Sequence, residues 1–145
     1  MQTTNPHHDH QHAPGASSQA SAGPEKLPGI RHVIAVGSGK GGVGKSTVSV
    51  NLAFALQQIG GRIGLVDADI LGPSIPGMLG LPVSQPPTTT PDGKIVPADC
   101  HNLKVMSMGM LTGDDAPAVL RGPMVGKYLH MFIRGVQWGH LDYLI

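Results

Sequence analysis

An α/β fold with three layers, in which helices cover both faces of a mostly parallel sheet, is what the sequence predicts. From residue 31 onward, short apolar runs of strand length alternate with segments whose apolar residues recur at helical spacing. The first apolar run leads through a glycine-rich loop into the first helical segment, which is the order of a strand followed by a helix. At 145 residues, one such domain is expected.

The first strand and helix are predicted within residues 33–60. The run 33–36 is apolar at every position, which is typical of a strand buried on both faces. After the loop, apolar residues recur with a helical period at Val48, Leu52, Ala55, Leu56 and Ile59. Gly60 and Gly61 then supply the left-handed residue at which helices commonly end. A helix is therefore expected to start at the glycine-rich loop and to end near residue 59.

The later elements continue the alternation. Further strands are predicted at residues 62–66, 103–108 and 141–145. A helix is predicted from Pro123, which suits the first turn of a helix, to about Arg134. Loops are predicted at residues 82–93, which end in the turn signal Asp92-Gly93, and at residues 113–117. Because the last strand is cut short, we expect the fold to be truncated at its C-terminus.

Residues 1–29 differ in composition from the rest of the chain. They are rich in His, Pro, Ala, Ser and Gly and bury too little apolar surface to offset the entropy of ordering. We predict that they are disordered and that residues 30–145 form the folded domain. Four histidines surround Asp9 in this tail, namely His7, His8, His10 and His12. Such imidazoles bind Ni²⁺, Zn²⁺ or Cu²⁺ weakly, although a solvated tail is the favoured interpretation.

The composition argues against nucleic-acid and membrane partners. The net charge of +1 and the aromatic content of 3% provide neither a basic surface nor a base-stacking surface. No apolar stretch approaches the roughly 18 residues that a membrane-spanning helix needs. A single cysteine offers no disulfide framework and fits a reducing compartment. We therefore expect a cytoplasmic protein that binds neither nucleic acid nor membrane.

The glycine-rich loop matches the phosphate-loop pattern G-x-x-x-x-G-K-[ST] at every fixed position. Its residues are Gly39, Lys40, Gly41, Gly42, Val43, Gly44, Lys45 and Ser46. The glycines lack a Cβ, so the backbone can curl until its N–H groups converge on phosphate oxygens. Lys45 places a charge on the β- and γ-phosphates, and the Ser46 hydroxyl suits Mg²⁺. The loop therefore predicts a P-loop NTPase, with the following helix aimed at the phosphates.

Two carboxylates follow the second predicted strand, at Asp67 and Asp69. Since strand side chains alternate, both would face the same way if the strand continued. Beside a phosphate loop, one carboxylate can bind Mg²⁺ through water while the other orients the water that attacks the γ-phosphate.

Four stretches of the chain, in order, resemble the Mrp/ApbC family of iron–sulfur cluster carrier ATPases. They are GSGKGGVGKST (37–47), DADILGPSIP (67–76), RGPM (121–124) and WGHLDY (138–143). The phosphate loop with its extra lysine would by itself indicate only the wider class that includes the MinD and ParA ATPases. The second and third stretches narrow the resemblance to the cluster carriers.

The resemblance implies a function and a role for each matching residue. A family member is expected to bind and hydrolyse ATP with Mg²⁺ as a homodimer, and to transfer a 4Fe–4S cluster to apoprotein recipients. Lys40 would reach the partner subunit's nucleotide, and Asp69 would orient the attacking water. Asp67 would act on Mg²⁺ through water, Ser46 would ligate it directly, and Thr47 would contact the α-phosphate.

The chain departs from the family pattern in its cysteines and near its end. Family members continue to an Asp and a Pro-Pro-Gly-Thr run, and they bind the cluster through a downstream Cys-x-x-Cys pair that is absent here. Cys100 is interpreted as an incidental loop thiol. Leu120 stands where tryptophan is expected, and Arg121 has no assigned role. We therefore expect an N-terminal fragment of a longer protein.

Three alternatives remain open from the sequence. One is a ParA- or MinD-like positioning ATPase, which a basic surface or a C-terminal amphipathic helix would favour. Another is a metal-insertion GTPase with a His-rich tail, which competition between ATP and GTP would reveal. The third is a nucleotide-binding fragment that neither hydrolyses ATP nor carries a cluster.

Overall fold

The computed structural model describes residues 26–69, 72–82, 87–112 and 122–145. The strands are β1 (Ile30–Val33), β2 (Ile63–Asp67), β3 (Ala98–Cys100), β4 (Leu103–Ser107) and β5 (Leu141–Leu144). The helices are α1 (Lys45–Gln58), α2 (Ile75–Leu79), α3 (Met108–Thr112) and α4 (Gly122–Arg134). The described strands form one sheet in the order β1-β5-β2-β4-β3, with β3 antiparallel to β4 and the other pairs parallel. The predicted α/β fold with a mostly parallel sheet is confirmed.

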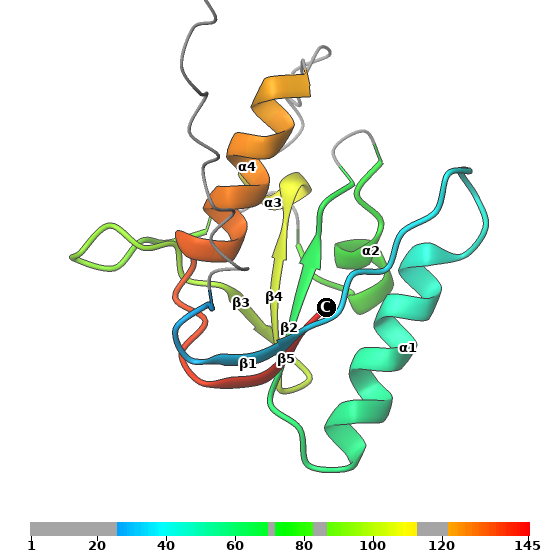
Figure 1. Cartoon of the computed structure of the whole chain (residues 1–145), viewed down its shortest axis with the longest axis horizontal. Coiled ribbons are helices and arrows are strands. Elements are labelled where there is room, and N and C mark those ends of the chain that lie inside the picture. The colour runs from blue at the N-terminus through cyan, green and yellow to red at the C-terminus, as the bar shows by residue number, and fades with distance from the viewer. Residues whose placement is uncertain (1–25, 70–71, 83–86, 113–121) are drawn as a thin grey trace, which may run out of the picture.

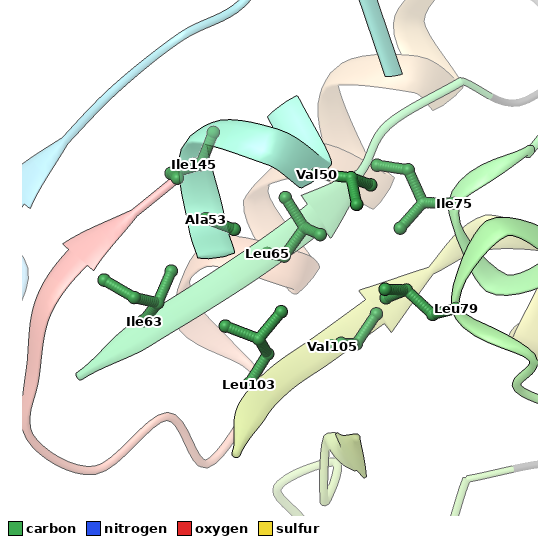
Figure 2. Packing of buried hydrophobic residues seen from close by; sticks show 9 residues of the cluster. All are labelled: Val50, Ala53, Ile63, Leu65, Ile75, Leu79, Leu103, Val105 and Ile145. Atoms are coloured by element: carbon green, nitrogen blue, oxygen red, sulfur yellow. The ribbon is translucent and has the colours of Figure 1, made fainter. Parts of the chain in front are cut away.

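Helices pack on both faces of the sheet, so the molecule has three layers (Figure 1). One apolar cluster joins α1 and α2 to the sheet through Val50, Ala53, Ile63, Leu65, Ile75, Leu79, Leu103, Val105 and Ile145 (Figure 2). A second cluster joins α4 to the opposite face through Met106, Met108, Phe132, Val136, Trp138, Leu141 and Leu144. The two clusters fix which side of the sheet each helix covers.

Strands β2 and β4 carry residues of both clusters because side chains alternate along a strand. On β4, Val105 packs in the first cluster and Met106 in the second. Both side chains are fully buried, as expected for an inner strand of a parallel sheet. Strand β2 ends at the buried residue Asp67, which places a carboxylate at the carboxyl edge of the sheet.

The first strand differs from its prediction in position and in burial. Strand β1 covers Ile30–Val33 instead of residues 33–36, and Val33 is 57% exposed. The strand pairs with β5 alone among the described strands, so the prediction of burial on both faces is wrong. Ile34 and Val36 are apolar because they pack against the first cluster, although they follow the strand without regular structure.

Helix α1 starts directly after the glycine-rich loop, as predicted, and of its predicted apolar face Leu52 and Leu56 pack against the first cluster, whereas the two ends of that face do not. Val48 is 56% exposed and Ile59 is 81% exposed. The buried residues are Ser49, Val50 and Ala53. The end of the helix is as predicted: Gly60 has a φ of 92°, and the N–H of Gly61 donates to the carbonyl of Leu56 at 3.0 Å.

Strands β2, β4 and β5 and helix α4 agree with their predictions to within one residue at each end. The turn at Asp92-Gly93 is also confirmed, since the Gly93 N–H donates to the Thr90 carbonyl at 2.9 Å and Gly93 has a φ of 82°. The sequence did not predict α2, α3 or β3, which are three to five residues long. The predicted loop at residues 113–117 lies outside the described residues.

Residues 1–25 of the predicted tail, with its histidines, also lie outside the described residues. Residues 26–29 are described, and Leu27 packs against the second cluster. The N–H of Leu141 donates to the Gly29 carbonyl at 2.8 Å. None of the helices in the described ranges is long and apolar enough to cross a membrane.

Candidate functional site

A pocket of about 400 Å³ opens at the carboxyl ends of the parallel strands, beside the first turn of α1. Its polar lining side chains belong to Ser38, Lys45, Ser46, Ser49, Asp67 and Asp69. In parallel α/β sheets, ligands bind outside these strand ends. Four residues that the sequence singled out are therefore together in one pocket: Lys45, Ser46, Asp67 and Asp69.

The loop before α1 turns back on itself through two glycines. Gly42 has a φ of 71° and Gly44 a φ of 93°, and an added Cβ at either would be strained in this left-handed region. Gly44 precedes the first residue of α1, and its carbonyl accepts the N–H of Val48 at 2.9 Å. The helix therefore begins at Lys45 with its free N–H groups at the pocket, an arrangement that favours an anion.

Asp67 is almost fully buried at the end of β2, with 3% of its surface exposed. Its carboxylate accepts the N–H of Ile75 at 2.9 Å and the N–H of Asp69 at 3.2 Å. Burial raises the pKa of the Asp67 carboxyl above its ordinary value because the charged form loses water, and the two N–H groups partly counteract this. A cation in the pocket would stabilise the charged carboxylate.

Asp69 is exposed and lies in the segment between β2 and α2. Its carboxylate accepts the N–H of Gly72 at 3.2 Å, which holds the start of this segment to its later part. Pro73 lies against α3, because a Cβ added to Gly109 would come within 3.1 Å of the Pro73 ring. The part of the segment at residues 72–73 thus contacts both Asp69 and α3.

The oxygen atoms in this pocket suit a magnesium ion. Mg²⁺ prefers oxygen ligands and is usually held by one or two carboxylates together with phosphates and water. The Ser46 hydroxyl and the carboxylates of Asp67 and Asp69 provide such oxygens on one side of the pocket. Within the residues that the structure describes, no group of three or more His, Cys, Asp or Glu side chains could hold a metal ion. Phosphate and water would therefore have to complete the coordination.

Several predicted site residues lie beside the pocket without lining it. Lys40 is exposed, and its backbone is held by Ser38, whose hydroxyl donates to the Lys40 carbonyl at 2.6 Å. Thr47 and Val43 are also exposed. The glycines that precede Lys45 in the loop, namely Gly39, Gly41, Gly42 and Gly44, are not among the lining residues either.

Three serines at the pocket were not predicted from the sequence. Ser38 and Ser49 line it, and the Ser74 hydroxyl donates to the Ser46 hydroxyl at 2.7 Å. Ser49 could have been found from its helical spacing after Lys45, since its hydroxyl donates to the Lys45 carbonyl one turn earlier. Ser74 could have been found as a serine before the pair Ile75-Pro76, which is a helix-start signal.

Cys100 lies at the end of β3, so the prediction of a loop thiol is wrong about its location. It is half-buried, and its Sγ donates to the carbonyl of Leu79 at 3.4 Å. Burial raises the pKa of the Cys100 thiol, which disfavours the thiolate that binds metal. Arg121 and Leu120 lie outside the described residues, so the structure gives no account of either.

Comparison with known proteins gives consistent results. The family model named ParA and described as NUBPL iron-transfer P-loop NTPase matches residues 29–145. A protein of Aquifex aeolicus named iron-sulfur cluster carrier protein is 49% identical over 122 residues, which cover 83% of this chain and 33% of the relative. The Arabidopsis thaliana protein named iron-sulfur protein required for NADH dehydrogenase, mitochondrial, is 48% identical over 133 residues, which cover 88% of this chain and 42% of the relative.

A solved structure has the same fold. It is a nucleotide-binding protein from Archaeoglobus fulgidus in complex with ADP, and it is 37% identical with a TM-score of 0.63. The match covers 80% of this chain and 42% of that chain. The present chain spans about a third of the length of the bacterial relatives that it matches.

Proposed function

The chain belongs to the ParA/NUBPL family of iron-transfer P-loop NTPases, and on that premise we propose that it binds ATP with Mg²⁺ in the pocket between β2 and α1. In the whole protein, ATP binding and hydrolysis would control the uptake of an iron–sulfur cluster and its transfer to apoprotein recipients. The names of the relatives, which describe cluster carriage and transfer, support this second part.

One observation carries the proposal for nucleotide binding: Lys45, Ser46, Asp67 and Asp69 line a single pocket at the start of α1. A triphosphate needs a cation, N–H groups and a metal ligand, and Lys45, the first turn of α1 and Ser46 are proposed to supply them here. ATP is proposed as the nucleotide because of the resemblance to ATPases and because the Archaeoglobus fulgidus neighbour binds ADP.

Each side chain has a physical role in this proposal. Lys45 holds the β- and γ-phosphates, and Thr47 contacts the α-phosphate. Ser46 ligates Mg²⁺ directly and Asp67 acts on it through water, so the buried carboxylate gains a compensating charge. Mg²⁺, when bound, neutralises part of the negative charge on the phosphates. These contacts position the nucleotide, which is most of what phosphoryl transfer requires.

Hydrolysis is assigned to two further side chains. Asp69 is exposed at the rim of the pocket and would orient the attacking water. Lys40 is exposed on the loop and does not line its own pocket, so its ammonium group is free to reach the nucleotide of a second subunit in a homodimer. A cation that acts in this way on the transferred phosphoryl group contributes about 10³–10⁵ in rate.

The cluster is cargo, and these 145 residues do not supply its ligands. A 4Fe–4S cluster is held by four cysteine thiolates, whereas Cys100 is the one cysteine in the sequence and its thiol is half-buried away from the pocket. Cluster carriage is therefore proposed for the whole protein on the strength of family membership. The cytoplasm remains the predicted compartment, on the basis of the low cysteine content.

Substitution of Lys45 tests the nucleotide site. We expect Lys45→Ala to lose measurable binding of a fluorescent ATP analogue, because the ammonium group proposed to hold the β- and γ-phosphates is removed. Titration of the analogue with Mg²⁺ present measures the affinity, and competition with unlabelled ATP and GTP measures base preference. If GTP displaces the analogue better than ATP does at the same concentration, the metal-insertion GTPase becomes the favoured function.

Lys94→Ala is the matched control, since Lys94 is an exposed lysine that does not line this pocket. It should bind the analogue as the unsubstituted chain does. Unchanged affinity in Lys45→Ala would refute the assignment of residues 39–46 as a phosphate loop.

A further inference from the structure

The side chains of Ser46 and Ser74 meet inside the proposed nucleotide site. The Ser74 hydroxyl donates to the Ser46 hydroxyl at 2.7 Å, although the two residues are 28 positions apart in the sequence. Ser46 belongs to the first turn of α1, and Ser74 is the residue before α2. The contact therefore joins the proposed metal ligand to the segment that follows the two aspartates.

Ser74 stands at the N-cap of α2 but does not cap it. A serine at this position usually accepts an N–H of the first helical turn through its side chain. Here no such hydrogen bond is formed, and the first N–H of α2, that of Ile75, donates to Asp67 at 2.9 Å instead. Asp67 thus takes over part of the capping, and the Ser74 hydroxyl is directed to Ser46.

The backbone around Ser74 is held from both sides. The Gly72 N–H donates to Asp69 at 3.2 Å, and Pro73 lies against Gly109 of α3. The N–H of the next residue, Ile75, donates to Asp67, so the backbone from which the Ser74 side chain extends is held in place. A group with so little freedom can orient its neighbour at a small cost in entropy.

We propose that Ser74 is a positioning residue that orients the Ser46 oxygen toward Mg²⁺, an inference that rests on the proposed function. A hydroxyl has one hydrogen and two lone pairs. When the Ser46 oxygen gives a lone pair to the cation, its own hydrogen becomes a stronger donor, and the Ser74 oxygen at 2.7 Å is placed to accept it. The hydrogen bond can thus reverse direction without displacement of either oxygen. Through it, metal binding is coupled to the segment that carries Asp69.

Nucleotide affinity with and without Mg²⁺ tests this role. The probe is ADP with a fluorescent N-methylanthraniloyl group, titrated into the full chain in Mg²⁺ and, separately, in EDTA. Ser74→Ala should reduce the gain in affinity that Mg²⁺ provides by about fivefold, the effect of one ordinary hydrogen bond, and leave the affinity in EDTA unchanged. Ser74→Thr keeps the hydroxyl and should keep most of the gain. Met78→Ala, at an exposed residue of α2, is the control and should behave as the unsubstituted chain.

Equal loss of affinity in Mg²⁺ and in EDTA would mean a merely structural role and would overturn the inference. The inference is also overturned if Ser74→Ala keeps the full gain while the unsubstituted chain binds more tightly in Mg²⁺. Failure of the unsubstituted chain to bind the probe at all would instead overturn the proposed function, and this inference with it.

Discussion

Gly64 of β2 lies against the second apolar cluster with no room for a larger side chain. A Cβ added there would lie 2.6 Å from Cδ1 of Leu141, 2.7 Å from Cδ1 of Leu144 and 3.1 Å from the Trp138 ring. The exposed fractions of these three side chains are only 2–3%, so none can move into solvent. Gly64→Ala therefore forces a rearrangement within a packed core.

The size of the effect follows from two opposing contributions. Overpacking of a well-packed core costs about 1–3 kcal/mol. Replacing glycine by alanine inside a strand raises the free energy of unfolding by about 0.5–1 kcal/mol, because the unfolded chain has less entropy. We expect a net destabilisation of about 1–2 kcal/mol, which lowers the melting temperature by roughly 4–8 °C in a domain of this size.

Thermal unfolding followed by circular dichroism measures this change, and urea unfolding gives the free energy independently. Gly126→Ala is a matched control, because Gly126 lies within α4 and a Cβ there would meet nothing within 4 Å. It should raise the free energy of unfolding by about 0.4–1 kcal/mol. The double variant Gly64→Ala with Leu144→Ala should be less destabilised than the sum of the two single variants, since the second change removes the methyl group in conflict.

The reasoning is refuted if Gly64→Ala is as stable as the unsubstituted chain while Gly126→Ala behaves as expected. It is also refuted if the double variant loses the full sum, because the packing conflict with Leu144 would then not exist.

Two further predictions concern residues near the starts of β1, β2 and β5. Gly29→Ala should destabilise the fold by at least about 1–2 kcal/mol in urea unfolding, because Gly29 has a φ of 80° and its Cβ would lie 2.5 Å from the Gly139 carbonyl oxygen. The hydrogen bonds from the Arg62 side chain and backbone, with the nearby charge of Arg31, hold the pKa of Asp142 below its ordinary value of 3.8. A carboxylate whose pKa is lowered by folding stabilises the fold above pH 3.8, and this stabilisation is lost as the pH falls below 3.8. Asp142→Asn should therefore be less stable than the unsubstituted chain at neutral pH and should approach its stability in acid.

Both predictions have clear contrary outcomes. Wild-type stability in Gly29→Ala would mean that the close approach to Gly139 is absent. A stability difference between Asp142→Asn and the unsubstituted chain that grows as the pH falls would have the opposite sign to a lowered pKa.

The long elements were predictable because they repeat a pattern over many residues. Helices α1 and α4 are 14 and 13 residues long, which is enough for a helical period and its end signals to be recognised. Helices α2 and α3 have five residues each, and β3 has three. Elements this short depend on contacts elsewhere in the fold, such as the hydrogen bond from the Ile75 N–H to Asp67. They are too short to show a recognisable period in the sequence.

The site was predictable where a motif or a strand end defined it. Asp67 and Asp69 were expected near Lys45 because the carboxyl ends of parallel strands meet at one edge of the sheet. Ser74 was missed because its hydrogen bond to Ser46 joins residues 28 positions apart and is formed only in the folded structure. The first strand was misplaced because the apolar residues Ile34 and Val36 serve the core without belonging to a strand.

Two strands that are neighbours in the sheet, β1 and β5, are the described strands farthest apart in the sequence, and this affects the order in which the sheet forms. Strand β1 pairs with β5, so that Ile30 lies opposite Leu141, and no other described strand is bonded to β1. Of the described strands, a ribosome delivers β1 first and β5 last, and such long-range pairing is slow because a large loop must close. The glycine-rich loop, which follows β1, therefore gains the support that β5 gives to β1 only after residues 141–144 have been made. We expect nucleotide to trap the state in which β1 and β5 have paired in refolding experiments, without accelerating the earlier steps.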